Sequence, residues 1–246
     1  MKQIVIGHRG ASAYAPENTM AAFQKAQDMG CRFIEFDVML SVDDELVVFH
    51  DETLERTTNG RGKVALATLD YLRSLEAGRW VSKTFAGEKI PSLQETIAWL
   101  SASSMHANIE IKPDKARIHE TTAAVLSEIT RYWPHNKSAP LVSSFEREAL
   151  VLCRSLAPEL PLGALIDTWE ETAVQFAREL QAYSVHLNQR IVTEKRVATL
   201  KEEGFVVYVY TVNKRRQAKT FFQWGVDAVF SDYPDLMNKT SRFLWW

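Results

Sequence analysis

The sequence predicts an α/β fold: a (β/α)8 TIM barrel with an insertion after its second strand. Short runs rich in β-branched residues alternate with longer helical patterns along the whole chain, which is typical of a parallel sheet whose strands are joined by helices. The length of 246 residues is common for a single barrel domain, and we expect residues 1–246 to form one. A doubly wound open sheet shows the same alternation and is the alternative.

Eight strands and seven helices are expected, in strict alternation. The strands are expected at 3–7, 33–40, 107–112, 140–145, 161–166, 183–188, 205–212 and 226–231. The helices are expected at 18–29, 92–103, 114–131, 146–156, 169–180, 193–203 and 214–224. Asn18 and Thr193 stand where helix caps are expected, and Gly30 and Gly204 stand where the same two helices should end.

Residues 41–91 interrupt the alternation, because this segment is too long for a loop between a strand and a helix. Loops longer than about 12–15 residues are usually functional or disordered, and the many apolar and aromatic residues here favour an ordered, functional insertion. A short extra strand is expected at Leu46–Phe49. Trp80 and Phe85 are candidates for the wall of a pocket, with ordinary core packing as the alternative.

The composition narrows the class of protein. Hydrophobic residues make up 46% of the chain and charged residues 24%, which are the averages of soluble globular proteins and exclude disordered and fibrous classes. The net charge of −2 gives no electrostatic reason to expect nucleic acid or an anionic membrane as a partner. No stretch approaches about 20 apolar residues, so we expect neither membrane insertion nor an export signal.

Two further features bear on location and assembly. Cys31 and Cys153 are the only cysteines, so we expect two reduced structural thiols and a cytoplasmic location. The apolar segment Phe243–Trp246 is expected to pack on the barrel or on a second subunit, which leaves a homodimer open.

Charged residues repeat at the same spacing on two neighbouring strands. Glu35 and Asp37 share one face of the strand at 33–40, and Glu110 and Lys112 share one face of the next. The apolar faces must contact the surrounding helices, so we expect the charged side chains to point into the mouth of the barrel. Three carboxylates exceed what one lysine neutralises, and their oxygens suit Mg²⁺ or Ca²⁺. A buried ion pair of Lys112 with one carboxylate is the alternative without a metal.

Two histidines are expected near this acidic cluster. His8 ends the first strand, and His50 follows the extra strand. Two imidazoles that titrate near neutrality, beside a cation and an arginine, meet the needs of acid–base cleavage of a phosphate ester. Arg9 can hold a non-bridging phosphate oxygen through its planar guanidinium. His186 is a weaker candidate for substrate contact inside the barrel. The remaining histidines, expected in solvent, are His106, His119 and His135.

Polar and aromatic residues also follow the ends of other strands. The residues are Ser143, Ser144 and Phe145, then Tyr210, Thr211, Val212 and Asn213, then Ser231 and Asp232. Each group alone is typical of a turn or a helix cap. Barrel active sites form at the carboxyl ends of the strands, so their shared position makes them candidates for the rim of a site.

Segments along essentially the whole chain resemble the glycerophosphodiester phosphodiesterase family, in the family's order. They are HRG (8–10), APENT (15–19), EFDVMLSVDDELVVFHDETLERTTNGRG (35–62), IPSLQET (90–96), NIEIKP (108–113), SSFE (143–146), YTVN (210–213) and GVDAVFSDYPD (225–235). The resemblance implies a barrel, a divalent cation, and hydrolysis of glycerophosphodiesters to sn-glycerol 3-phosphate and an alcohol. It also implies attack of the glycerol 2-hydroxyl on phosphorus, through a cyclic phosphate that water then opens.

Residue by residue, the resemblance implies three groups of functional side chains. They are His8 and His50 as the catalytic pair, Glu35, Asp37 and Glu110 as metal ligands, and Arg9 and Lys112 as phosphate contacts. Tyr210 is expected at the substrate pocket, where much of the family has tryptophan, and Ser231 stands where much of it has threonine. The segments APELP (157–161), HLN (186–188) and VYTVNK (209–214) further resemble the cytosolic bacterial branch found beside glycerol-phosphate uptake systems.

Two other functions use a similar barrel. A lysine-base barrel of the enolase type takes its metal ligands from three successive strands, whereas two of the candidates here share one strand. A catalytically inactive barrel that only binds a phosphodiester or a partner should have lost a member of the set, and none is missing. Both comparisons favour the hydrolase.

Overall fold

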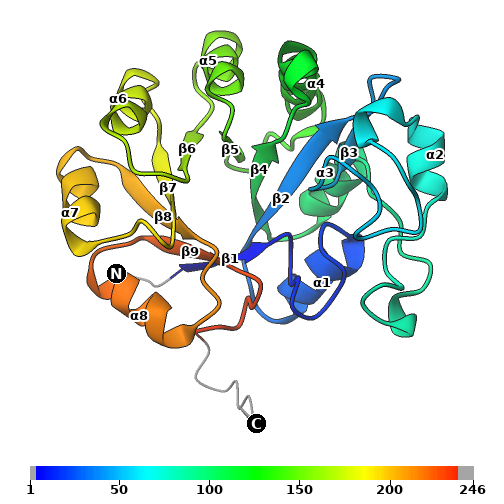
Figure 1. The fold of residues 1–246 in the computed structure, drawn as a ribbon, viewed down its shortest axis with the longest axis horizontal. Coiled ribbons are helices and arrows are strands. Elements are labelled where there is room, and N and C mark those ends of the chain that lie inside the picture. The colour runs from blue at the N-terminus through cyan, green and yellow to red at the C-terminus, as the bar shows by residue number, and fades with distance from the viewer. Residues whose placement is uncertain (1–3, 238–246) are drawn as a thin grey trace.

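The computed structural model describes residues 4–237, which form a closed parallel barrel (Figure 1). Within them the barrel strands are β1 (Ile4–His8), β2 (Phe33–Leu40), β4 (His106–Ile111), β5 (Leu141–Ser144), β6 (Leu162–Ile166), β7 (Ser184–Asn188), β8 (Val206–Tyr210) and β9 (Ala228–Ser231). Neighbours in this order pair in parallel, and β9 pairs with β1, which closes the ring. The predicted TIM barrel is confirmed, and the open-sheet alternative is excluded.

Helices surround the strands, as the amphipathic patterns require (Figure 1). They are α1 (Met20–Asp28), α3 (Leu93–Ala102), α4 (Ile118–Tyr132), α5 (Arg147–Leu156), α6 (Glu171–Glu179), α7 (Glu194–Glu202) and α8 (Arg215–Gln223). In α5, for example, Ala149, Leu150 and Cys153 are buried, a spacing that puts them on one helix face. A 3-10 turn, η3 (Lys115–Arg117), precedes α4. The order and positions agree with the expected helices.

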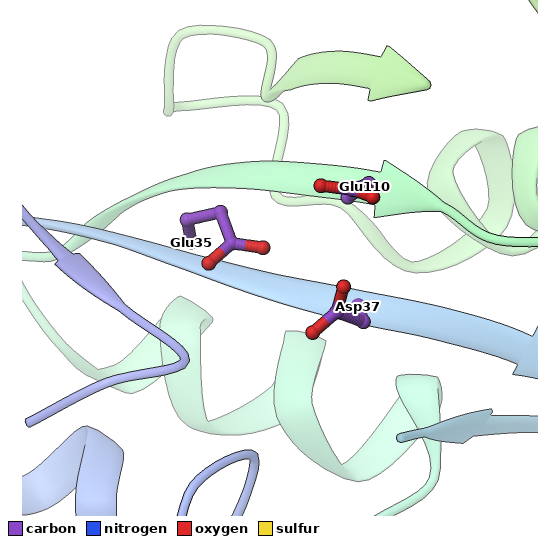
Figure 2. A group of neighbouring side chains, drawn as sticks. All are labelled: Glu35, Asp37 and Glu110. Atoms are coloured by element: carbon purple, nitrogen blue, oxygen red, sulfur yellow. The ribbon is translucent and has the colours of Figure 1, made fainter. Parts of the chain in front are cut away.

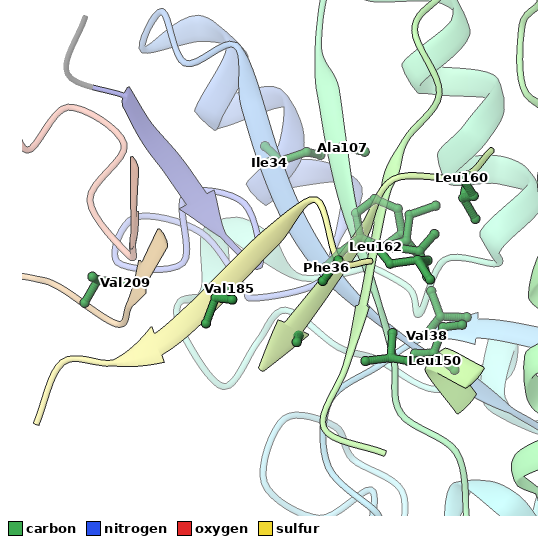
Figure 3. Close-up of a cluster of buried hydrophobic side chains, with 14 of the residues drawn as sticks. Ile34, Phe36, Val38, Ala107, Leu150, Leu160, Leu162, Val185 and Val209 are labelled. Carbon is green, nitrogen blue, oxygen red and sulfur yellow. The ribbon is translucent and has the colours of Figure 1, made fainter. Parts of the chain in front are cut away.

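The main core lies between the strands and these helices (Figure 3). Ile34, Phe36 and Val38 of β2 point outward into it and are fully buried. Because side chains alternate along a strand, Glu35 and Asp37 point the other way, into the barrel. Packing of the outer layer therefore fixes which residues of β2 reach the site.

A second apolar cluster closes the interior of the barrel below the strand ends. It contains Ile6, Leu141, Tyr208, Ala228 and Phe230. Ile6, Tyr208 and Phe230 each stand two positions before a residue at the carboxyl end of the same strand or just after it, and Leu141 is the first residue of β5. The interior is thus filled on its amino side, and the open end lies at the carboxyl ends of the strands.

The insertion folds as an ordered unit beside β2. Its strand β3 (Leu46–Val48) pairs antiparallel with the end of β2, beyond the short β1. It also contains α2 (Leu69–Ser74) and the 3-10 turns η1 (Val64–Leu66) and η2 (Lys83–Phe85), which the sequence analysis did not anticipate. The small core of this region consists of Met39, Val47, Phe49, Leu54, Val64, Ala67, Leu72, Leu75, Ala77 and Ile90. The expected extra strand is confirmed.

Two aromatic residues of the insertion, candidates for a pocket wall with core packing as the alternative, do not form that wall. Trp80 is 45% exposed, and its indole donates a hydrogen bond to the carbonyl of Ala77 at 2.9 Å. Phe85 is half-buried in η2. Neither lines the two cavities at the strand ends.

The start of α1 also differs from the prediction. Thr19 is the cap, and its hydroxyl accepts a hydrogen bond from the Ala22 amide at 3.3 Å. Asn18 instead adopts a left-handed φ of 55° and turns its buried side chain toward the acidic cluster. The stop signals hold, since Gly30 and Gly204 have φ values of 79° and 86°, and Thr193 caps α7 as expected.

Both cysteines are buried free thiols, as predicted. Cys31 donates hydrogen bonds to the carbonyls of Val5 and Phe33. Among residues 4–237, none of the helices has the length and apolar character needed to cross a membrane. The segment Phe243–Trp246 lies outside the described residues.

Candidate active site

Three carboxylates from β2 and β4 converge inside the barrel mouth (Figure 2). The strand register places Asp37 beside Glu110, and Glu35 lies two residues earlier on the same face of β2. One oxygen of each carboxylate lies within 4.8 Å of the others, and Glu35, Asp37 and Glu110 are 3%, 1% and 9% exposed. Three oxygen donors at this spacing fit a hard divalent cation better than a softer metal, which prefers thiolate or imidazole ligands.

Burial and mutual repulsion perturb the pKa values of these carboxyls. Burial, with the charge of Asp37 adding to it, raises the pKa of Glu110 to about 8. Burial, with the charges of Asp37 and Glu110 adding to it, raises the pKa of Glu35 well above its usual range. Burial also acts to raise the pKa of Asp37, but Arg9 and other nearby cations outweigh it, so that this pKa is lowered. The raised pKa values of Glu35 and Glu110 indicate that Arg9 and Lys112 do not fully compensate three ionised carboxylates, so a further cation would stabilise the ionised forms.

Two cationic side chains approach the cluster. Arg9 places Nε 3.4 Å from Asp37 Oδ2, while its backbone amide donates to Glu35 Oε2 at 2.9 Å. Lys112 places Nζ 3.8 Å from Asp37 Oδ1 and 3.8 Å from Glu110 Oε1. The lysine distances exceed those of hydrogen bonds, so the ammonium group retains donors for an anionic ligand.

The turn after β1 aims Arg9 into the site. Arg9 and Gly10 both have positive φ, at 54° and 82°, and a Cβ on Gly10 would lie 2.8 Å from the Cβ of Ala22. Glycine is therefore needed for this turn to pass against α1. Asn18 completes the turn, because its Nδ2 donates to Asp37 Oδ2 at 2.9 Å and so orients that carboxylate.

His8 is held by partners from the barrel rim. Its Nδ1 lies 2.7 Å from Asp232 Oδ1, which leaves Nε2 as the nitrogen available to a ligand. Asp232 in turn accepts hydrogen bonds from the Ser12 hydroxyl at 3.0 Å and from Asn213 Nδ2 at 2.5 Å. Residues after β8 and β9 thus orient a histidine at the end of β1.

His50 is held by a chain of charges. Its Nδ1 lies 2.5 Å from Asp51 Oδ1, and Arg56 Nε donates to Asp51 Oδ2 at 2.6 Å. Arg56 also donates two hydrogen bonds of 2.7 Å to Glu17, which accepts a third, of 2.6 Å, from Arg9. The chain therefore links a histidine of the insertion to the arginine beside the acidic cluster.

The pKa of His50 is lowered. Burial is the main cause, and the charges of Arg9 and Lys112 add to it, while Asp37 opposes them. The imidazole is consequently neutral at pH 7 and has the protonation state that a proton acceptor requires.

Two neighbouring cavities at the strand ends share part of their lining, including His50, Glu110 and Lys112. The inner one, of about 170 Å³, is lined by both histidines and the acidic cluster, and the outer one, of about 630 Å³, lies toward the insertion and α5. Tyr210 is half-buried in the inner wall, where its ring meets Phe145 edge to face at 5.8 Å between centroids. The structure thus places all eight residues predicted for the site around the inner cavity, namely His8, Arg9, Glu35, Asp37, His50, Glu110, Lys112 and Tyr210.

The other histidines divide as expected. His106, His119 and His135 are exposed, and His119 forms an ion pair with Glu148 at 2.6 Å. His186 is fully buried and lines the inner cavity.

Comparison with known proteins decides the family. A sequence model of the glycerophosphoryl diester phosphodiesterase family matches residues 8–236. The chain belongs to this family. A glycerophosphodiester phosphodiesterase of Caldanaerobacter subterraneus subsp. tengcongensis is 34% identical over 242 residues, which are 98% of this chain and 99% of that protein. One from Bacillus subtilis is 33% identical over 256 residues, which cover 97% of this chain and 86% of that protein.

A solved structure agrees with this assignment. A phosphodiesterase of Oleispira antarctica, in complex with the product sn-glycerol-3-phosphate, matches with a TM-score of 0.91 and 37% identity, covering 94% of this chain and 93% of that chain. The predicted family and the enzyme class, a phosphoric diester hydrolase, are confirmed, and the two rival functions are set aside. The more specific resemblance to the cytosolic bacterial branch stays a prediction.

Several residues of this phosphodiesterase site were not foreseen as functional. Asn18 was expected to cap a helix, whereas Glu17 and Arg56 were noted only as members of family-like segments. The partner of each lies far along the chain: Asn18 bonds Asp37, 19 residues away, and Arg56 bonds Glu17, 39 residues away. Their only signal in the sequence was their place in APENT (15–19) and in the segment after His50.

Proposed function

We propose that this phosphodiesterase hydrolyses glycerophosphodiesters to sn-glycerol 3-phosphate and an alcohol, using a divalent cation, Mg²⁺ or Ca²⁺, held by Glu35, Asp37 and Glu110. The observation that carries the proposal is one cavity lined by three buried carboxylates and by two histidines, each with a carboxylate on its Nδ1. The product bound to the related Oleispira antarctica enzyme supports the same substrate class.

Each group of residues has a defined task in this proposal. When bound, the cation neutralises phosphate charge and polarises the nucleophilic oxygen. Arg9 and Lys112 contact the non-bridging phosphate oxygens, and the chain through Glu17 holds the guanidinium of Arg9 in place. Tyr210 and Phe145 form the wall beside the bound substrate.

The histidines move the protons. In the first step the glycerol 2-hydroxyl attacks phosphorus, its proton passes to neutral His50, and the bond from phosphorus to the alcohol oxygen breaks. His8 gives a proton to that oxygen, and the alcohol leaves. Water then opens the cyclic phosphate with the proton transfers reversed, which yields sn-glycerol 3-phosphate. Holding the hydroxyl next to phosphorus supplies several kcal/mol through proximity alone, and an analogue that lacks the 2-hydroxyl should therefore be cleaved poorly.

Metal dependence tests the proposal. Purified protein should release choline and sn-glycerol 3-phosphate from glycerophosphocholine, and exhaustive chelation should abolish this turnover. Added Mg²⁺ or Ca²⁺ should restore it and should also raise the melting temperature, because a ligand that binds only the folded state stabilises it. Full turnover by protein that elemental analysis finds free of metal would contradict the proposed role of the carboxylates.

The proposal also covers the partner, the cellular location and the oligomeric state of the protein. The partner we propose is a small-molecule glycerophosphodiester rather than nucleic acid, and the reduced cysteines support the proposed cytoplasmic location. A homodimer stays a prediction, to be checked by the mass of the protein in solution.

A further inference from the structure

Unpartnered polar atoms gather around the inner cavity. Within the described residues, six buried side-chain nitrogen or oxygen atoms have no hydrogen-bond partner. Four of these atoms, Arg9 Nε, Asn108 Oδ1, His186 Nδ1 and the Tyr210 hydroxyl, belong to residues that line this cavity, although Arg9 Nε also forms the ion pair with Asp37 Oδ2 at 3.4 Å. A buried polar atom without a partner costs about 1–3 kcal/mol, so this concentration indicates a ligand whose polar groups would complete them.

Two of the four atoms belong to uncharged side chains and are held rigidly, and one of these side chains, Asn108, pairs with Glu35 across β2 and β4. Asn108 stands two residues before Glu110 on β4, and its Nδ2 donates to Ser143 Oγ at 2.9 Å, which leaves Oδ1 as a free acceptor. His186 stands on β7, and its Nε2 lies 2.8 Å from Ser184 Oγ, which leaves Nδ1 free.

Neighbouring residues fix the imidazole of His186. Its ring stacks on Tyr208 and packs against Phe230, with 5.1 Å between centroids in each case. Gly163 on β6 provides the space, because a Cβ at that position would lie 2.6 Å from the imidazole. The position of Nδ1 is therefore set by packing on both sides of the ring.

The two side chains proposed to line the inner end of the cavity, Asn108 and His186, are neutral as well as polar. Burial lowers the pKa of His186 to about 3, so its imidazole carries no charge at pH 7, and Asn108 is uncharged. A phosphate oxygen cannot satisfy Asn108 Oδ1, since both are acceptors. A hydroxyl group donates one proton and accepts others, so it can donate to Asn108 Oδ1 and accept from His186 Nδ1–H in the tautomer whose Nε2 accepts from the Ser184 hydroxyl.

The inner end is also closed. Tyr208 and Phe230 belong to the apolar cluster that fills the barrel below, together with Ile6 and Leu141. A ligand of three carbons fits a volume of about 170 Å³, but a longer group attached at this end would meet the apolar cluster.

We propose that Asn108 and His186 bind the terminal hydroxyl of the substrate's glycerol moiety and thereby select glycerol that carries no acyl chain at that position. This inference rests on the proposed function, because it needs the phosphate at Arg9 and Lys112 and the 2-hydroxyl beside the carboxylates. The third oxygen of glycerol then reaches the neutral inner end.

A pair of substrates tests the inference. Glycerophosphocholine is compared with its 1-deoxy analogue, the phosphocholine ester of propane-1,2-diol, which keeps the 2-hydroxyl and lacks only the terminal one. Wild-type protein should prefer glycerophosphocholine by at least about tenfold in kcat/KM, because the analogue leaves two buried polar atoms unpaired. In His186→Phe and Asn108→Ala this preference should fall to about twofold or less, mainly through slower cleavage of glycerophosphocholine. His106→Phe, a matched substitution of an exposed histidine, should keep the wild-type preference.

The outcomes separate this inference from the proposed function. If wild-type protein cleaves neither substrate, the proposed function fails. If it cleaves both with equal kcat/KM, hydrolysis stands and the binding role of Asn108 and His186 is overturned, whether or not the variants fold. If the variants slow both substrates equally and keep the preference, the two residues act only on the structure, and the inference is likewise overturned.

Discussion

The site has a barrel half and an insertion half, which hold equivalent groups by different means. In the barrel half, Asp232 engages His8 and is itself bonded by the neutral side chains of Ser12 and Asn213. In the insertion half, Asp51 engages His50 and is bonded by the cation of Arg56. The barrel half is thus a set of hydrogen bonds among strand ends, whereas the insertion half is a chain of alternating charges.

Substitutions in the two halves should therefore affect activity and stability differently. The charged chain continues through Glu17 to Arg9, so a change at the exposed end of the insertion half can reach the residue that we propose contacts phosphate. The hydrogen bonds of the barrel half end within the rim and interior of the barrel. We therefore expect the insertion half to affect activity at little cost in stability, and the barrel half to link activity with folding.

Removing either histidine should have the largest effect. His8→Ala and His50→Ala should each lower kcat on glycerophosphocholine by about 10²–10⁴-fold with the fold intact, while His119→Ala should leave it unchanged. A substrate with p-nitrophenol as the leaving alcohol distinguishes the halves, because such a group departs without a proton. The loss in His8→Ala should shrink strongly on that substrate, and the loss in His50→Ala should not. Equal losses on both substrates in both variants would contradict the assignment of His8 as the acid.

The strands and carboxylates of the site could be predicted because they depend on local alternation. The pattern in β2 set Glu35 and Asp37 on the inner face, and the register with β4 then brought Glu110 beside them. The partner of His8 depends on closure of the barrel instead. His8 and Asp232 are 224 residues apart, and only the pairing of β9 with β1 brings them together.

The insertion half was harder to predict for a different reason. The length and composition of 41–91 predicted an ordered insertion, and the structure has one, but periodicity did not reveal where it docks. Contacts of Arg56 with Glu17 and the outward position of Trp80 both depend on that docking. Asn18 was assigned to a cap because such residues favour helix starts, whereas its bond to Asp37 is a tertiary contact that no local rule anticipates.

Arg56 offers the next test, with a smaller expected effect. Arg56→Ala should lower kcat/KM by about 10–100-fold, since it frees Asp51 and leaves Glu17 with Arg9 alone. The melting temperature should change little because Arg56 is 45% exposed and Glu17 keeps its hydrogen bond from Arg9. The kcat/KM of Arg56→Lys should lie between those of the wild type and Arg56→Ala, because one ammonium cannot span both carboxylates as the guanidinium does. Arg73→Ala is the matched control, since Arg73 forms an exposed ion pair with Glu95 away from the site. Wild-type kcat/KM in Arg56→Ala would show that the charged chain does not serve the site.

The smallest effect is expected in the barrel half, as a dependence of stability on pH. Burial lowers the pKa of His186 from 6.5 to about 3, so the folded protein keeps this imidazole neutral while the unfolded chain takes up a proton below pH 6.5. The unfolded state then binds more protons, and the contribution of His186 to stability is complete above pH 6.5 and is lost as the pH falls toward 3. The slope is about 1.4 kcal/mol per pH unit for one proton.

Urea unfolding of metal-free protein at several pH values between 7 and 4.5 measures this slope. His186→Phe cannot take up the proton in either state, so its free energy of unfolding should fall less steeply than that of the wild type over this range, by about 1.4 kcal/mol per pH unit at most. His106→Phe removes an exposed imidazole instead and should follow the wild-type slope. Parallel slopes in wild type and His186→Phe would mean that His186 is protonated in the folded state. This result would contradict the claim that a neutral His186 lines the cavity in the barrel half, in contrast to the charged side chains of the insertion half.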